Sequence, residues 1–282
     1  MSHLEYLPGM KAGSKIDLAS LPSARFEKDK KPKPETYLPE LRAQLSDLAE
    51  RLNSEHGYFF NAEAQLEMSG PDLEVDRGLV AEKEAEWAGE VGKSVEDFLA
   101  ARAKNPASIT EMATTLLFDK ILGGEFVVVR ASTFDDYENG ADQLIIDKKT
   151  GAVICGLDDV LIHTGEGSEK KEGKIAAKMK HGGASIKYGA TIEAGSLKRR
   201  SLKHIPLFYF SLSKNDLDSL LSSLAANKPE PDGVETMVYA QLVNSLVAQA
   251  SKFQADASLS APLKENLEHF SPSLRKMQKR VR

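Results

Sequence analysis

The sequence has few of the residues on which disulfide and zinc frameworks depend. It contains one cysteine, Cys155, and six histidines among 282 residues. A single cysteine excludes an internal disulfide and a cysteine-based zinc cluster. The histidines are scattered, and no two of them have the i, i+4 spacing of a helical zinc site. We therefore expect neither a disulfide framework nor a zinc centre.

The sequence also lacks a long apolar run. No segment approaches the roughly 18 consecutive apolar residues that a membrane span requires, and the first twenty residues have no apolar run typical of a secretory signal. We therefore expect a cytoplasmic protein without a membrane partner. The sequence contains 37 Lys and Arg against 42 Asp and Glu, a formal net charge of −5, and 41% hydrophobic residues. This composition is typical of a globular protein with a buried core.

Changes in composition divide the chain into four predicted parts. Residues 1–36 contain a proline- and lysine-rich run, EKDKKPKPE, which buries little apolar surface, so we expect a flexible arm. Residues 37–107 are predicted to form a helical extension. Residues 108–228 are expected to form an α/β core, and residues 229–282 a C-terminal helical segment with a basic tail.

Three helices are predicted in the parts that flank the core. Leucines at three- and four-residue spacing predict an amphipathic helix over 38–57, and an apolar-rich helix is predicted over about 234–255. A helix over 79–104 is rich in Glu, Lys and Ala and carries the only tryptophan, Trp87. Because an apolar helix face needs a partner surface, the helices over 38–57 and 234–255 would allow homo-oligomerisation.

The expected core begins with a helix over about 109–122. Ser108 is a candidate N-cap with Glu111 at capping-box spacing, and Gly123 and Gly124 end the helix. The β-branched run Phe126–Val129 predicts a strand that is buried on both faces. The later elements are a hairpin of strands 143–147 and 152–157 joined by KKTG, a basic helix over 168–181, strands over 184–192 and 205–212, and a helix over 214–226.

The predicted hairpin brings two acidic residues together. If it turns within KKTG, Asp142 lies opposite residue 157, one step from Asp158. Asp159 points to the other face of the strand, because side chains alternate. Two carboxylates held together at strand ends repel each other, and a divalent cation between them would relieve the repulsion.

Each acidic candidate also has a purely structural interpretation. Asp142 fits a turn, Asp158 fits the end of a strand, and Glu111 fits a capping box. The neighbouring Asp135 and Asp136 are expected to cap a turn.

The order of these elements resembles the PD-(D/E)XK phosphodiesterase superfamily, the restriction-endonuclease-like nucleases. The matching features are a helix with Glu111, the strand Phe126–Val129, a hairpin that starts at Gly140-Ala141-Asp142, a second strand that ends in Cys155-Gly156-Leu157-Asp158, and a basic helix. The resemblance implies a restriction-endonuclease-like mixed sheet flanked by helices, with helical N- and C-terminal additions. It also implies a nuclease that depends on Mg²⁺ or Mn²⁺.

Carried over to this sequence, the resemblance implies that Asp142 and Asp158 ligate the metal. Glu111 would bind a second metal ion or orient the attacking water. The family's lysine should lie two residues after the second acid, where this chain has Val160. The missing cation would come from the basic helix, where Lys170, Lys174 and Lys178 recur every four residues on one face.

Lys187, in the strand predicted after the basic helix, is another candidate for the missing cation, because any of these lysines could stabilise charge on the phosphate. The departure at Val160 fits a descendant that has lost activity equally well.

A basic segment follows the predicted site. From Lys170 to Lys203 the sequence has ten cations and two anions, in a chain whose net charge is negative. A phosphate backbone would be attracted to such an excess. The residues expected to bind nucleic acid are Lys170, Lys171, Lys178, Lys180, Lys198, Arg199 and Arg200. The alternatives to a nuclease are a non-catalytic nucleic-acid-binding protein of the same fold and a scaffolding protein that acts through its flanking helices.

Overall fold

The computed structural model describes residues 32–162 and 165–280, with the side chains of residues 159–170 left out of the description. The predicted arm, residues 1–36, lies almost entirely outside the described residues. One compact unit begins at Lys33. Its helices are α1 (Leu38–His56), α2 (Leu73–Glu90), α3 (Val95–Arg102), α4 (Pro106–Leu122), α5 (Gly165–Lys180), α6 (Lys214–Ala225), α7 (Gly233–Gln254) and α8 (Ala261–Lys279), with short helical turns η2 (Pro34–Tyr37) and η3 (Asp135–Asn139).

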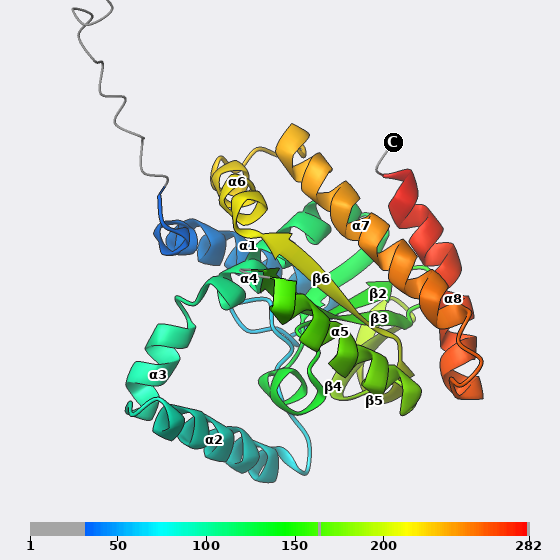
Figure 1. Ribbon diagram of the computed structural model, residues 1–282, viewed down its shortest axis with the longest axis horizontal. Coiled ribbons are helices and arrows are strands. Elements are labelled where there is room, and N and C mark those ends of the chain that lie inside the picture. The colour runs from blue at the N-terminus through cyan, green and yellow to red at the C-terminus, as the bar shows by residue number, and fades with distance from the viewer. Residues whose placement is uncertain (1–31, 163–164, 281–282) are drawn as a thin grey trace, which may run out of the picture. The chain divides into compact units, whose positions relative to one another are not determined.

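A four-stranded mixed sheet forms the core of this unit (Figure 1). Its strands are β1 (Phe126–Arg130), β2 (Gln143–Asp147), β3 (Val153–Ile162) and β6 (Leu207–Ser213), in that spatial order. The first three form an antiparallel meander, and β6 pairs in parallel with β3. Every residue of β1 is buried, as its β-branched run predicts. The mixed α/β class expected from the sequence is confirmed.

Helices cover both faces of the sheet. Phe208 and Phe210 of β6 project to one face, where their ring centroids lie 4.8–6.1 Å from aromatic rings of α4, α7 and α8. Tyr209 lies between them and points to the other face, where its hydroxyl lies 3.5 Å from the carboxylate of Glu172 in α5. Because strand side chains alternate, α5 covers one face and the other three helices cover the opposite face.

A second, two-stranded sheet consists of β4 (Ala184–Glu193) and β5 (Ser196–Ile205) and is inserted between α5 and β6. Strand β4 matches a predicted strand, but the sequence analysis missed β5. The reason is visible in its burial, since most of its positions are exposed or half-buried and carry lysine, arginine or serine. Such a strand lacks the apolar alternation on which the prediction depends.

The two apolar helices predicted in the flanking parts are confirmed as α1 and α7. Their apolar faces are buried inside the unit, since Leu41 and Leu45 of α1 and Leu242 and Leu246 of α7 have no exposed surface. The partner surface that these faces require is therefore supplied within the unit, which removes the reason for expecting oligomerisation through them.

Three other helix predictions needed correction. The helix predicted over 79–104 is two helices, α2 and α3, separated by a turn in which Gly92 has a φ of +65°. Helix α4 begins at Pro106, and the side chain of Asn105 caps it by accepting a hydrogen bond from the Ala107 backbone N–H (2.9 Å). Ser108 is therefore not the N-cap. Most of the predicted basic tail belongs to α8, which has a buried apolar face.

Cys155 is fully buried in β3, and burial raises the pKa of its thiol. Within the described part of the chain, no helix is long and apolar enough to cross a membrane.

Candidate functional site

Strand pairing places the two predicted acids together. The backbone N–H of Asp142, just before β2, donates to the carbonyl of Leu157 (2.8 Å), and Gln143 is also paired with Leu157. Asp142 therefore lies next to Asp158 across the strands, although the observed register differs by one position from the predicted one, which placed Asp142 opposite residue 157. The register of this pair of strands shifts between Ile145 and Ile146, where a β-bulge or similar irregularity interrupts the regular ladder. Asp142 is 9% exposed and Asp158 is 5% exposed.

The turn η3 passes close to this pair and ends in a glycine. Gly140 has a left-handed backbone, with a φ of +59°. A Cβ atom at this position would lie 3.5 Å from Nζ of Lys178 and 4.0 Å from Oδ2 of Asp158. Both are ordinary contact distances, so glycine is favoured at position 140 by its left-handed backbone and not by a lack of space, and η3 lies close to β3 and α5 here.

Asp136 of η3 is a third acid at the same place. Its carboxyl group is hydrogen-bonded to that of Asp142, and the negative charge of Asp158 contributes to raising its pKa. Burial raises the pKa of Asp136, although Arg102, whose Nη2 lies 3.1 Å away, and Arg130 oppose the change. A hydrogen bond between two carboxyl groups needs a proton on one of them, and the raised pKa favours that proton.

The adjacent Asp135 has the turn-capping role that the sequence predicts for both residues. Its buried carboxylate accepts hydrogen bonds from the side chains of Ser132 (2.7 Å) and Asn139 (2.8 Å). It also accepts from the backbone N–H groups of Lys187 (2.7 Å) and Tyr188 (2.9 Å). The capping prediction is therefore right for Asp135, whereas the side chain of Asp136 contacts the other acids.

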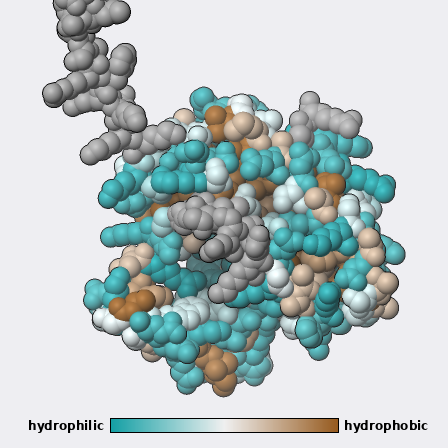
Figure 2. All heavy atoms as spheres, viewed as in Figure 1, coloured by the Kyte–Doolittle hydropathy of each residue, from teal (hydrophilic) through white to brown (hydrophobic). Residues whose placement is uncertain are grey.

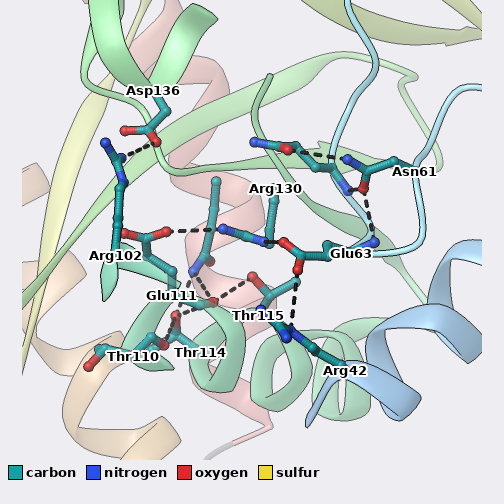
Figure 3. A network of polar contacts seen from close by, with 12 residues as sticks. Arg42, Asn61, Glu63, Arg102, Thr110, Glu111, Thr114, Thr115, Arg130 and Asp136 are labelled. Atoms are coloured by element: carbon teal, nitrogen blue, oxygen red, sulfur yellow. Dashed lines mark hydrogen bonds and ion pairs between the residues drawn. The ribbon is translucent and has the colours of Figure 1, made fainter. Parts of the chain in front are cut away.

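Glu111 approaches the group from α4 (Figure 3). Its carboxylate lies 3.2 Å from Nη2 of Arg130, whose Nη1 lies 3.0 Å from Glu63. Burial raises the pKa of Glu111, and the positive charges of Arg130 and Arg102 oppose the rise. Because α4 begins at Pro106, Glu111 lies inside the helix, and its interpretation as a capping-box residue is wrong.

Two lysines of α5 reach the acids from above the sheet. Lys171 forms an ion pair with Asp158, and the ammonium group of Lys178 donates to the carbonyl of Asn139. Burial lowers the pKa of Lys178, and the charge of Asp158 opposes the change. Lys174, which the sequence suggested as the displaced lysine, is exposed. The positions that reach the acids are therefore Lys171 and Lys178, two helical turns apart.

Lys187, the other candidate for the missing cation, belongs to a different group. Its Nζ lies 2.6 Å from Asp76 and 3.1 Å from Asp72. The hydroxyl of Tyr188 also donates to the buried carboxylate of Asp76 (2.5 Å). These contacts fasten α2 to β4.

The other predicted nucleic-acid-binding residues are divided between surface and structural positions. Lys180, Lys198 and Arg200 are exposed, and Arg200 pairs with Glu193 (2.7 Å). Arg199 packs over the ring of Phe59 at 4.9 Å and donates to the carbonyl of Glu67. The side chains of Lys170 and of Val160, the residue in the family's lysine position, lie outside the described residues.

We call the group formed by Glu111, Asp136, Asp142 and Asp158, with Arg102, Arg130, Lys171 and Lys178, the acidic site. Sequence reasoning missed Asp136, Arg102 and Arg130, because no local pattern distinguishes them from capping and surface residues. In residues 32–162 and 165–280, no three Asp, Glu, His or Cys side chains are arranged as a metal site. Two of the acids, Asp136 and Asp142, are hydrogen-bonded to each other.

No protein-family model, curated protein or solved structure matches this chain. The function must therefore be argued from the acidic site and its surroundings.

Proposed function

We propose that this chain is a metal-dependent nuclease whose acidic site hydrolyses phosphodiester bonds of DNA or RNA. The observation that carries the proposal is the contact between the carboxyl groups of Asp136 and Asp142 beside Asp158. Buried acids in contact are unfavourable unless a proton or a cation lies between them. At a substrate-binding site, such an arrangement favours the binding of a divalent cation in place of the proton.

The chemistry of these donors fits Mg²⁺ or Mn²⁺. Both ions prefer oxygen ligands, and Mg²⁺ is usually held by one or two carboxylates together with waters and substrate phosphates. Asp142 and Asp158 would hold the ion, and Glu111 would support the site from α4. The bound ion would polarise the scissile phosphate and lower the pKa of the attacking water.

The lysines of α5 supply the positive charge that the family places on its motif lysine. Lys171 lies on Asp158, and Lys178 lies beside Asp158 and Asn139. Their ammonium groups are placed to bind a phosphate that approaches the acids and to stabilise the charge that develops on it. This placement offers a replacement for the lysine that is missing at Val160.

The element order also supports the proposal. Helix α4, strands β1, β2 and β3 and helix α5 follow one another as in the resemblance drawn from the sequence, and the β4–β5 hairpin and β6 come after them. A restriction-endonuclease-like core is therefore part of the proposal, as is nucleic acid as the partner.

Two measurements on the same variants test the proposal. Mn²⁺ is titrated calorimetrically into the wild type, Asp142→Asn and the control Asp47→Asn, an exposed position on α1. The same proteins are incubated with single- and double-stranded DNA and RNA. We expect saturable binding and metal-dependent cleavage that Asp142→Asn abolishes and Asp47→Asn keeps. Cleavage by Asp142→Asn at the wild-type rate, or no metal binding at millimolar concentration, would contradict the proposal.

A non-catalytic nucleic-acid-binding protein of the same fold is the second candidate. The observation that favours it is that two of the acids already form ion pairs within the protein, Asp158 with Lys171 and Asp136 with Arg102. Such pairs neutralise the acids without a metal. This candidate predicts salt-sensitive nucleic-acid binding that requires no metal, is unaffected by Asp142→Asn and leads to no cleavage.

A further inference from the structure

A pocket of about 450 Å³ opens beside the acidic site, between α2, α3 and α4. Trp87 and Phe98 supply its aromatic lining, and Arg102, Ser108 and Glu111 supply polar groups. Arg102 and Glu111 belong to both the pocket and the acidic site, so the two are continuous. No pattern in the sequence predicts this pocket, because its lining comes from three helices.

The helices that carry the aromatic residues expose other apolar side chains. Figure 2 shows hydrophobic patches along α2 and at the turn between α2 and α3, on a face that is otherwise mostly hydrophilic. The residues concerned are Val75, Leu79, Val91 and Val95. Val91 also lines the pocket.

The lining suits a flat heterocycle with polar edges. The ring centroids of Trp87 and Phe98 are 6.4 Å apart, and the guanidinium of Arg102 lies 5.3 Å from the Trp87 centroid. Aromatic and guanidinium planes are the groups on which proteins stack nucleobases. Asn105 and Ser108 add hydrogen-bonding groups for the edge of a base. The volume lies within the range of pockets that hold small ligands.

Tyr137 of η3 packs against Trp87 and against Arg102 of α3, whose guanidinium lies 4.4 Å from the Tyr137 ring centroid. The Trp87 ring meets the edge of Tyr137 at 4.9 Å, and the hydroxyl of Tyr137 donates to Glu84 (2.9 Å). Lys83 of the same helix pairs with Glu138 (2.7 Å). These contacts hold α2 on η3, and Trp87 and Phe98, which contact each other, form the aromatic part of the pocket wall.

We infer that this pocket receives one unstacked base of a single-stranded nucleic acid whose backbone lies at the acidic site. The inference rests on the proposed function, because that proposal places a phosphate at the acidic site. A base within a continuous duplex is stacked and paired and would have to be extruded before it could enter, whereas a base of a single strand turns out at a smaller cost. The preferred substrate is therefore single-stranded DNA or RNA.

Fluorescence provides a direct test, because Trp87 is the only tryptophan in the chain. The metal-free protein is titrated with oligothymidylate and, separately, with a blunt duplex of the same length. We expect a saturable change in tryptophan emission with the single strand and little change with the duplex. Phe98→Ala should weaken single-strand binding on the order of tenfold. Tyr58→Ala, which removes an aromatic ring that is 91% exposed, should leave it unchanged.

A second variant keeps the test valid if Phe98→Ala disturbs the α2–α3 pair. Ala101 lines the pocket and is exposed on α3, so Ala101→Leu narrows the pocket without removing a packed ring. Circular dichroism checks the fold of both variants. Equal binding of duplex and single strand, or unchanged affinity in a folded Ala101→Leu variant, would overturn the inference.

The outcome also separates this inference from the nuclease proposal. Metal-dependent cleavage without a response of Trp87 to the single strand would refute the pocket assignment and keep the nuclease. A response of Trp87 that Ala101→Leu weakens, without any cleavage, would keep the pocket and refute the nuclease.

Discussion

Asp135 and Asp136 are adjacent residues with the same side chain, and their surroundings differ sharply. Asp135 is fully buried and accepts hydrogen bonds from two side chains and two backbone N–H groups. Asp136 meets the carboxyl group of Asp142 and the guanidinium of Arg102. The first carboxylate stabilises the fold, whereas the second is held where negative charge is already concentrated. The same substitution at the two positions should therefore change stability in opposite directions.

Asp135→Asn should destabilise the protein by about 3 kcal/mol. One carboxylate oxygen is replaced by an NH₂ group, which cannot accept the hydrogen bonds that the donors around Asp135 now make. Urea denaturation at neutral pH measures the change. Because Lys187 and Tyr188 of β4 supply two of the donors, amide hydrogen exchange in β4 should also become faster. Unchanged stability would show that these donors find other partners.

Asp136→Asn should stabilise the metal-free protein at neutral pH, on the order of 2–4 °C in Tm. Burial raises the pKa of Asp136, so at pH values between its unfolded-state and folded-state pKa the folded state holds more of this proton than the unfolded chain does. The contribution of this proton to the free energy of unfolding falls as the pH rises from the unfolded-state pKa of Asp136 to its folded-state pKa. Asn does not titrate, so the variant avoids this loss of stability. The gain should disappear below about pH 4, where both states are protonated. Thermal unfolding across pH tests this, and a lower Tm at neutral pH would contradict it.

At the scale of the elements, the turn between β2 and β3 joins the two sheets. Gly151 in this turn has a φ of +72°, and its carbonyl accepts a hydrogen bond from the backbone N–H of Ile192 in β4 (2.8 Å). A Cβ atom on Gly151 would lie 1.9 Å from the carbonyl oxygen of Ile192. The hairpin therefore packs against β4 at a position that only glycine allows.

Gly151→Ala should cost at least about 3 kcal/mol, because it adds a steric clash with backbone to an unfavourable left-handed conformation. Gly195→Ala is the matched control, since Gly195 also has a positive φ, +81°, but no atom lies within 4 Å of its added Cβ. That control should lose only about 1 kcal/mol. Urea denaturation compares the two, and equal losses would contradict the close packing at Gly151.

The sequence predicted those elements whose pattern is local. The bounds of β2, Gln143–Asp147, match the prediction, because an apolar run between turn residues defines both ends. The break at Gly92 was missed although it has a local signal: Ser94 caps α3 by accepting a hydrogen bond from the Asp97 backbone N–H (3.1 Å). The Asp142–Asp158 pair was predictable because hairpin register is local, whereas Asp136 and Lys171 reach the same place only through the packing of η3 and α5.

At the scale of the whole molecule, charge is unevenly distributed. The chain carries a net charge of −5, yet exposed cations are found at the end of α5 and along β5, among them Lys180, Lys198 and Lys203. The acids of the acidic site are buried or half-buried beneath α5. A nucleic acid would therefore meet positive charge first on this side of the molecule.

Replacing Lys180, Lys198 and Lys203 together by Gln should weaken nucleic-acid binding and flatten its salt dependence. Each lost phosphate contact should reduce the slope of log K against log salt by about 0.7–0.9. Fluorescence anisotropy at several salt concentrations measures the slope. Lys228→Gln, an exposed lysine between α6 and α7, is the control and should keep the wild-type slope. Identical slopes for both proteins would place the binding surface elsewhere.

Because Cys155 is buried, the native protein should not react with thiol reagents. Only the thiolate reacts, and burial both shields this thiol and raises its pKa. Because no second cysteine competes, a cysteine introduced at Gly92 would accept a dye alone and report movements of α2 and α3 against the sheet. In the unmodified chain, the rate at which Cys155 becomes labelled reports how often the core opens.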